Sequence, residues 1–169
     1  MKNSRVIDVK EMVKKFGRFV ANDRLTFHVD RGEIFGFLGA NGAGKTTAMK
    51  ILCGLSAPTS GEIFVAGHNV YNETEKIKRK IGYMSQRFSL YEDMTIFENF
   101  RFYGGIYGMG RKEIRSATEQ FLVKLDLKKA RNQLIGSLPL GWKQKLAFSV
   151  AIMHNPDIVF LDEPTSGVD

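Results

Sequence analysis

The nine residues from Gly39 to Thr47, GANGAGKTT, constrain the fold of this chain more than any other stretch. They match the pattern G-x-x-x-x-G-K-[ST], in which a glycine-rich turn and the start of a helix surround phosphate groups. The apolar run before them, residues 33–38, predicts a buried strand, and the apolar spacing after them predicts a helix over 46–55. Strand, glycine-rich turn and helix in this order aim backbone N–H groups at phosphate oxygens. The loop therefore predicts an α/β fold that binds a nucleoside triphosphate.

The residue types in this loop have separate roles in holding a nucleotide. Its glycines supply backbone freedom and leave room where phosphate must approach closely. Lys45 can reach the β- and γ-phosphates, and the hydroxyl of Thr46 can bind Mg²⁺. We expect the nucleotide-binding residues of the loop to be Gly39, Asn41, Gly42, Ala43, Gly44, Lys45, Thr46 and Thr47.

A pair of carboxylates, Asp162 and Glu163, is the second chemical landmark. Four apolar residues, 158–161, precede the pair and predict a buried strand, so Asp162 lies at the strand's carboxyl end, where α/β sheets bind ligands. Asp162 can hold Mg²⁺ directly or through a water, and Glu163 can act as the general base for an attacking water. Together with a phosphate loop, the pair predicts hydrolysis of the nucleotide.

The rest of the chain divides into a strand-rich first half and a helical second half. Alternation of apolar residues predicts strands over 5–9, 25–29, 62–66 and 81–84. A short basic helix is predicted over 73–80, a helix opened by the capping box Thr95–Glu98 over 95–103, and another over 111–125. Gly104 and Gly105 are expected to interrupt the middle helix. From about 88 to 153 the pattern is helical throughout.

Phe16 lies between the first two predicted strands and leaves two alternatives open. It could be a core side chain, or it could be a stacking platform for a purine ring, since its strands lead to the phosphate loop.

Composition limits the possible partners. The net charge of +7 comes from 25 basic and 18 acidic residues, but the basic residues are scattered and no aromatic residues interleave with them. We interpret them as a solvated surface facing nucleotide and anionic lipid headgroups, and expect no nucleic-acid partner. The single cysteine, Cys53, excludes a disulfide framework. No apolar run approaches the ~18–20 residues of a membrane span, and the start lacks a signal-peptide core, so a cytosolic protein is expected.

These motifs, in this order, resemble the ATP-binding domains of ABC transporters along nearly the whole chain. GANGAGKTT resembles the Walker A motif of that family, and residues 159–169, VFLDEPTSGVD, resemble Walker B followed by the D-loop. The resemblance implies that Asp162 holds Mg²⁺ and that Glu163 is the catalytic glutamate. It implies that Gln86, in the Q-loop, senses Mg²⁺ and the attacking water, and that Phe16 stacks on adenine.

The resemblance also implies an architecture and partners. We expect a P-loop NTPase (RecA-like) α/β core with an N-terminal antiparallel β layer and an inserted helical subdomain. One domain would span 1–169, with its core over 1–87 and 154–169 and the helical subdomain over 88–153. ATP and Mg²⁺ are the implied cofactors.

The implied partners are a second ATPase domain, as a homodimer or tandem partner, and transmembrane permease subunits. The permease subunits would dock near the aromatic residues that follow Gln86, namely Phe88, Tyr91 and Phe97. The protein would then lie in the cytoplasm, peripheral on the inner face of the cell membrane.

The chain departs from the family pattern at its signature. Where LSGGQ is expected, residues 138–142 are LPLGW, a variant that resembles some ATPase subunits of type-2 exporters of the drug-efflux kind. Pro139 replaces the serine that would bond the partner's γ-phosphate, and the side chain of Leu140 disfavours the positive φ that glycine allows. The sequence ends at Asp169, and the resemblance implies a further strand and a switch histidine beyond it.

Three functions follow from these observations. The first is an ATPase subunit that powers export through membrane permease subunits. The second is a regulatory half of an ABC dimer, whose own site turns over slowly because of LPLGW. The third is a soluble ABC ATPase that acts on ribosomes or in DNA repair.

Overall fold

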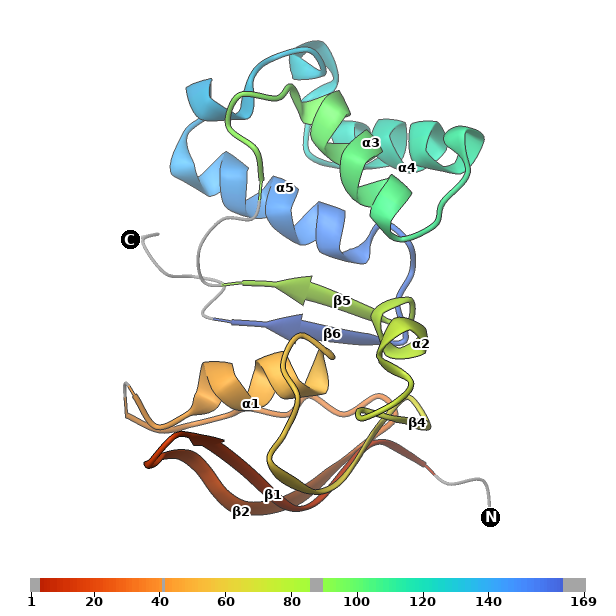
Figure 1. Ribbon diagram of the computed structural model, residues 1–169. Helices are drawn as coiled ribbons and strands as arrows, with labels where there is room; N and C mark the ends of the chain where they lie inside the picture. The colour runs from red at the N-terminus through yellow and green to blue at the C-terminus, as the bar shows by residue number, and fades with distance from the viewer. Residues whose placement is uncertain (1–3, 41, 86–89, 163–169) are drawn as a thin grey trace. The chain divides into compact units, whose positions relative to one another are not determined.

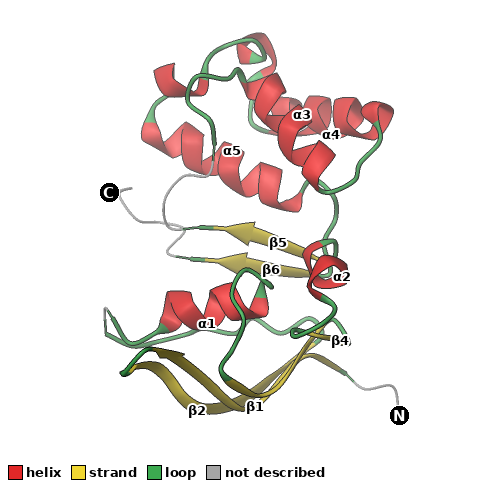
Figure 2. Cartoon of the chain, in the orientation of Figure 1, coloured by secondary structure: helices red, strands yellow, loops and turns green. Residues whose placement is uncertain are grey.

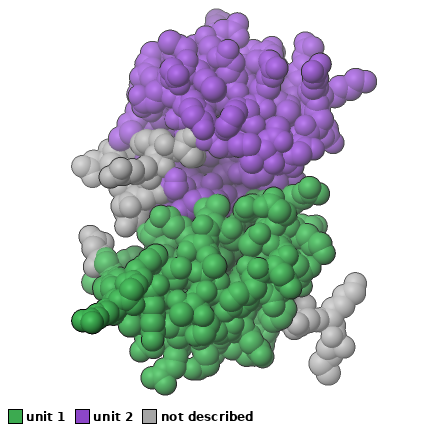
Figure 3. All heavy atoms as spheres, viewed as in Figure 1, with its two compact units in different colours: residues 1–81 green, residues 82–169 purple. Residues whose placement is uncertain are grey.

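The computed structural model describes residues 4–40, 42–85 and 90–162, and the chain forms two compact units, residues 1–81 and 82–169 (Figure 3). Unit 1 contains most of the strands and two helices, whereas unit 2 is mainly helical (Figure 2). The predicted mixture of α and β structure is confirmed.

Unit 1 is built on a four-stranded antiparallel sheet in the order β2-β1-β3-β4. Its strands are β1 (Arg5–Phe16), β2 (Phe19–Asp30), β3 (Ser60–Val65) and β4 (His68–Asn69). The expected antiparallel layer is therefore present, but its first two strands are longer than the sequence predicts.

A β-bulge explains why the sequence underestimates β1. Ile7 and Val9 are buried at the period of two, but the next buried residue is Met12, three positions further on. Between them Glu11 has a φ of 51°, and the pairing with β2 shifts register. The extra residue interrupts the alternation that a sequence pattern depends on, while the strand itself continues. Gly61 of β3 fits against this bulge, since a Cβ there would lie 2.7 Å from the carbonyl oxygen of Glu11.

Two helices accompany this sheet. Helix α1 (Lys45–Leu52) lies over one face of β1 and β2 (Figure 1) and buries Ala48, Met49, Ile51 and Leu52. Helix α2 (Thr74–Lys78) is short and buries only Ile77. The core of unit 1 thus forms between α1 and the buried face of the sheet.

Residues 33–38 do not form the strand that the sequence predicts. The segment has no strand assignment, and its apolar residues divide between two sides. Phe35 and Phe37 pack on Phe27 of β2, with ring centroids 5.3 and 5.2 Å apart. Ile34 is 100% exposed and Leu38 is 96% exposed. The expectation of a buried strand is therefore wrong for this structure, since the segment joins neither sheet and two of its apolar side chains are exposed.

A two-stranded sheet pairs β5 (Ile81–Met84) with β6 (Ile158–Leu161), and the two strands run in the same direction in Figure 1. Gly82 allows β5 to pass close to α5, because a Cβ there would collide with the carbonyl oxygen of Ala151. The predicted strand is present, but Phe160 is buried whereas Val159 and Leu161 are each 39% exposed, so it is only partly buried.

The helical part of unit 2 contains α3 (Ile96–Ile106), α4 (Arg111–Lys124), η1 (Lys128–Ala130), η2 (Ile135–Ser137) and α5 (Leu140–Ile152). They enclose one apolar cluster, whose fully buried members include Ile96, Phe100, Leu122, Ile135 and Leu146. The predicted helical character of this region is confirmed for its described residues. Within residues 4–40, 42–85 and 90–162, no helix has the length and apolarity needed to cross a membrane.

Two features of α3 test the sequence predictions. The capping box is confirmed, since the hydroxyl of Thr95 accepts from the Glu98 N–H at 3.2 Å and the Glu98 carboxylate accepts from the Thr95 N–H at 2.8 Å. The predicted interruption at Gly104 and Gly105 is wrong, because α3 continues through both. Gly104 serves close packing instead. A Cβ at this position would lie 2.6 Å from Cγ1 of Ile114 on α4.

Candidate nucleotide-binding site

The phosphate loop of unit 1 ends at the N-terminus of α1. Gly44 is the N-cap residue, with a φ of 79°, and its carbonyl accepts the first helical bond from Ala48 at 2.9 Å. The Nζ of Lys45 donates to the carbonyl oxygens of Gly39 and Ala40 at 2.7 and 2.8 Å. The ammonium group therefore lies against the start of the loop. The first turn of α1 contains no acidic residue, so the positive end of its dipole is open to an anion.

Glycine is required at position 44 for two reasons. The positive φ is strained for any residue with a Cβ. In addition, a Cβ would collide with the carbonyl oxygen of Ala21 and lie 2.6 Å from Nδ2 of Asn22. The backbone of the loop thus passes directly against β2, as no larger residue would allow.

Asn22 is a contributor to the loop that the sequence does not reveal. Its side chain is 4% exposed, and its Nδ2 donates to the carbonyl oxygen of Gly44 at 3.1 Å. Strand β2 thereby fixes the N-cap of α1. A sequence pattern gives no signal for this contact, because the two residues are 22 positions apart and asparagine is common in surface turns.

Phe16 lies at the end of β1 and is 54% exposed, so the alternative of a core side chain is wrong. The Nζ of Lys14 lies 4.8 Å from the centroid of its ring. The end of the β1–β2 hairpin and the start of α1 lie at the same end of unit 1 in Figure 1. An exposed aromatic ring near a phosphate loop is suited to stacking on a base.

In unit 2, Asp162 directly follows β6 and is 5% exposed. Its backbone N–H donates to the carbonyl oxygen of Met84 at 2.9 Å, which aligns the ends of β5 and β6. Buried carboxylate and threonine hydroxyl oxygens are hard ligands of the kind that Mg²⁺ prefers, so Asp162 and Thr46 suit this ion chemically. Asn41, Gln86 and Glu163 lie outside the described residues.

The LPLGW segment starts α5. Pro139 is the N-cap, and its carbonyl accepts from the N–H groups of Trp142 and Lys143 at 3.0 and 3.2 Å. Leu140 is the first residue of the helix and does not have a positive φ. The position therefore does not require the positive φ that the side chain of Leu140 disfavours. Ser137, just before the segment, donates its hydroxyl to the carbonyl oxygen of Leu134 at 2.8 Å.

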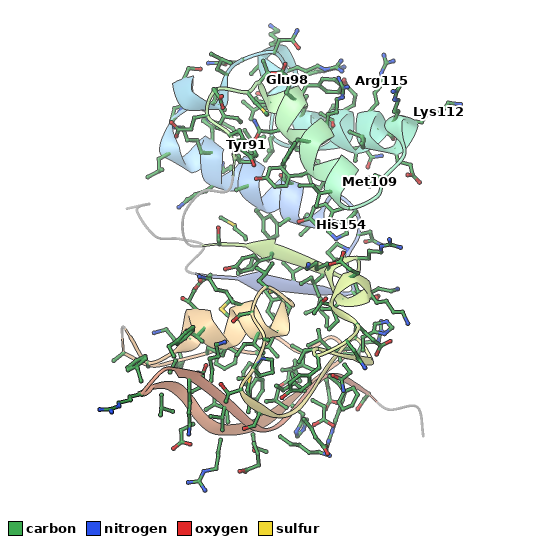
Figure 4. All side chains as sticks on the ribbon, viewed as in Figure 1. Tyr91, Glu98, Met109, Lys112, Arg115 and His154 are labelled. Carbon is green, nitrogen blue, oxygen red and sulfur yellow. The ribbon has the colours of Figure 1, made fainter. Side chains whose placement is uncertain are left out.

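His154 has a structural contact at the end of α5. Its ring stacks on that of Tyr107 with centroids 3.7 Å apart. Figure 4 labels His154 beneath α3, whereas Lys112 and Arg115 point outward from α4.

The model of the family described as ABC transporter matches residues 22–166. The chain belongs to this family. Over 164 residues it is 48% identical to the probable multidrug ABC transporter ATP-binding protein YbhF of Escherichia coli, covering 97% of this chain and 28% of that protein. It is 37% identical to the bacitracin transport ATP-binding protein BcrA of Bacillus licheniformis, covering 98% of this chain and 53% of that protein. This chain therefore spans only part of the length of these relatives.

Solved structures support the same fold. An ATP-binding subunit of an ABC transporter superimposes with a TM-score of 0.86 at 29% sequence identity, covering 97% of this chain and 68% of the other. The chain thus has the α/β fold of the P-loop NTPases within the ABC family, as its sequence predicts. The family match begins at residue 22, so Phe16 lies outside it.

Proposed function

We propose that this ABC chain binds and hydrolyses ATP and thereby powers the export of a substrate through membrane permease subunits. The observation that carries the proposal is the phosphate loop. Gly44 lies directly against β2, the Nζ of Lys45 contacts the start of the loop, and α1 begins at Lys45 itself. A relative named as a Nod factor export ATP-binding protein, 36% identical over 163 residues, supports export as the direction.

In this proposal different residues of the chain bind different parts of MgATP. Lys45 exchanges its bonds to the loop carbonyls for the β- and γ-phosphates, and the N-terminus of α1 stabilises their charge. Phe16 stacks on adenine. The remaining loop residues approach the phosphates through their backbone N–H groups.

Hydrolysis needs residues in addition to those of the phosphate loop. Thr46, Asp162 and Gln86 would hold or sense Mg²⁺, which neutralises charge on the phosphates when it is bound. Glu163 accepts the proton of the attacking water. The site would form in a single ABC domain, with its core over 1–87 and 154–169 and its helical subdomain over 88–153.

A second ATPase domain and permease subunits complete the proposed assembly. An aromatic cluster on unit 2 supports a docking role for the segment after Gln86. Tyr91 is 43% exposed and contacts Phe102, with ring centroids 5.0 Å apart. Phe97 is less suited to docking than expected, because the guanidinium of Arg131 covers its ring at 4.0 Å. Phe88 lies outside the described residues. This assembly would place the chain on the inner face of the cell membrane.

Two substitutions test the proposal by calorimetry and phosphate release. Lys45→Ala should abolish tight MgATP binding while the protein stays folded, whereas Lys50→Ala, in the last turn of the same helix, should bind normally. Glu163→Gln should keep its ATP affinity and lose most of its turnover, because an amide cannot accept the proton. Unchanged binding in folded Lys45→Ala, or unchanged turnover in Glu163→Gln, would reject the assignment.

One observation favours the second candidate, a regulatory half with a slow site. Pro139, at the N-cap of α5, has neither a hydroxyl nor an N–H to offer a partner's γ-phosphate. Such a charge-assisted bond is worth about 1.5–3 kcal/mol, or about one to two decades in affinity.

Restoring the serine tests this candidate. In the Glu163→Gln background with ATP, Pro139→Ser should tighten the dimer in analytical ultracentrifugation, and Pro139→Ala should not. Leu140→Gly should not help, because Leu140 is already helical and unstrained. If Pro139→Ser has no more effect than Pro139→Ala, LPLGW is a working variant and the slow-site candidate is rejected.

A further inference from the structure

We propose that Lys14 is a positioning residue for the adenine base, acting by holding the ring of Phe16 in place. This inference rests on the proposed function, because it requires ATP to bind with its base against Phe16. Lys14 itself would touch neither the base nor the phosphates.

Lys14 is held by two contacts of one atom. Its Nζ donates to the carbonyl oxygen of Ala57 at 2.7 Å and lies 4.8 Å from the centroid of the Phe16 ring. The ammonium group therefore covers one face of the ring. Phe16 is 54% exposed, so only part of its ring is covered by the rest of the protein and Lys14 adds a contact to the ring.

The acceptor of this bond belongs to an anchored loop. Two residues after Ala57, the N–H of Thr59 donates to the carbonyl oxygen of Val13 at 2.8 Å. The hydroxyl of Thr59 accepts from the N–H of Lys15 at 2.9 Å. The loop also follows α1, the helix that begins at the phosphate loop. The bond from Lys14 to Ala57 thus connects the aromatic platform with the chain leaving that helix.

This arrangement has a direct consequence for affinity. A ring that samples several rotamers must be ordered when the base stacks on it, and that ordering reduces the binding free energy. Lys14 orders the ring beforehand, and a cation over one face of an aromatic ring is attracted by its π electrons. The contribution of Lys14 should therefore appear only for ligands that carry a base.

The test compares MgATP with magnesium tripolyphosphate by isothermal titration calorimetry. Lys14→Met keeps the apolar stem and removes the charge, and we expect it to weaken MgATP binding by about two- to five-fold. Tripolyphosphate binding should not change, and Lys14→Arg should restore MgATP affinity. Lys15→Met is the matched control for the loss of one positive charge on the same strand, and it should bind both ligands normally. Equal weakening of both ligands in Lys14→Met would overturn the inference.

A double-mutant cycle shows whether Lys14 acts through Phe16. In the Phe16→Ala background, Lys14→Met should cause no further loss of MgATP affinity, and a loss as large as in the parent would also overturn the inference. Other results would reject the proposed function, so its failure can be distinguished from failure of the inference about Lys14. Normal MgATP binding in Lys45→Ala rejects nucleotide binding at this loop, and normal binding in Phe16→Ala rejects the stacking platform. If both of these variants bind weakly and Lys14→Met binds normally, only the inference about Lys14 is rejected.

Discussion

Replacing Asn22 with leucine should leave the protein at least as stable as before and yet weaken its binding of ATP. The side chain is buried and donates one bond, from Nδ2 to the carbonyl oxygen of Gly44. No donor among the described residues reaches its Oδ1. Losing the bond costs about 0.5–1.5 kcal/mol, while removing a buried, unsatisfied acceptor recovers about 1–3 kcal/mol. The midpoints of these ranges differ by about 1 kcal/mol in favour of leucine, so the free energy of unfolding should rise by about 1 kcal/mol.

The effect on ATP binding has the opposite sign. The carbonyl of Gly44 still accepts from the Ala48 N–H, so α1 keeps its first turn. The phosphate loop, however, loses its side-chain link to β2. We expect the Kd for MgATP to rise about two- to ten-fold, which corresponds to one ordinary hydrogen bond. Urea unfolding without nucleotide and calorimetric titration with MgATP measure the two effects separately.

The same substitution at Asn99 provides a matched control. This asparagine is also buried, at 1% exposed, but unlike Asn22 it has hydrogen bonds at both its Oδ1 and its Nδ2. Its Oδ1 accepts from the Tyr91 N–H at 2.8 Å, and its Nδ2 donates to the carbonyl oxygens of Tyr91 and Thr95, each at 3.0 Å. Asn99→Leu should therefore destabilise the protein by about 2–4 kcal/mol. A loss of that size in Asn22→Leu would refute the reasoning, since it would mean that Oδ1 of Asn22 is satisfied.

Three further predictions concern stability and are measured by urea unfolding. Thr95→Ala removes the hydroxyl half of the capping box and should cost about 1 kcal/mol, whereas Thr95→Ser should cost little. Gly104→Ala should destabilise unit 2, because the added Cβ meets Ile114; an unchanged midpoint would show that α3 and α4 can separate freely. The Asn69 N–H, and then Lys76, lower the pKa of Glu73 from 4.5 to about 2. The stability that its carboxylate contributes is thus present above about pH 4.5 and is lost as the pH falls towards 2. Glu73→Gln should be less stable than the parent at pH 6, and the difference should shrink at pH 3; a difference independent of pH contradicts the cause.

The sequence predicts a structural feature correctly where the residues that interact are close together in the chain. The capping box needs only Thr95 and Glu98, three residues apart, and both of its bonds are found. The glycine-rich loop likewise predicts the start of α1 within one residue. In both cases the atoms that interact are close in the chain, so the residue pattern and the geometry carry the same information.

Where the residues in contact are far apart in the chain, the sequence pattern does not predict the structure. The apolar run 33–38 predicts a buried strand, but only Phe35 and Phe37 pack on the sheet, where both contact Phe27. An apolar run does not indicate whether another strand will pair with it, and none of the described strands does so here. Gly104 was misjudged for a related reason. The low helix propensity of glycine argues against a helix here, but the close approach of Ile114 leaves no room for a larger residue.

The β layer of unit 1 acts on the site through contacts that the sequence does not show. Asn22 of β2 holds the N-cap of α1, and Lys14 of β1 holds the loop that follows the same helix. Both ends of α1 are therefore tied to one hairpin, whose tip carries Phe16. Because these bonds join the proposed aromatic platform to the phosphate loop, a change in one should be transmitted to the other. In the proposed function one ligand contacts both the aromatic ring and the phosphate loop. A connection between them favours binding, since ordering one part before binding lowers the entropic cost of ordering the other.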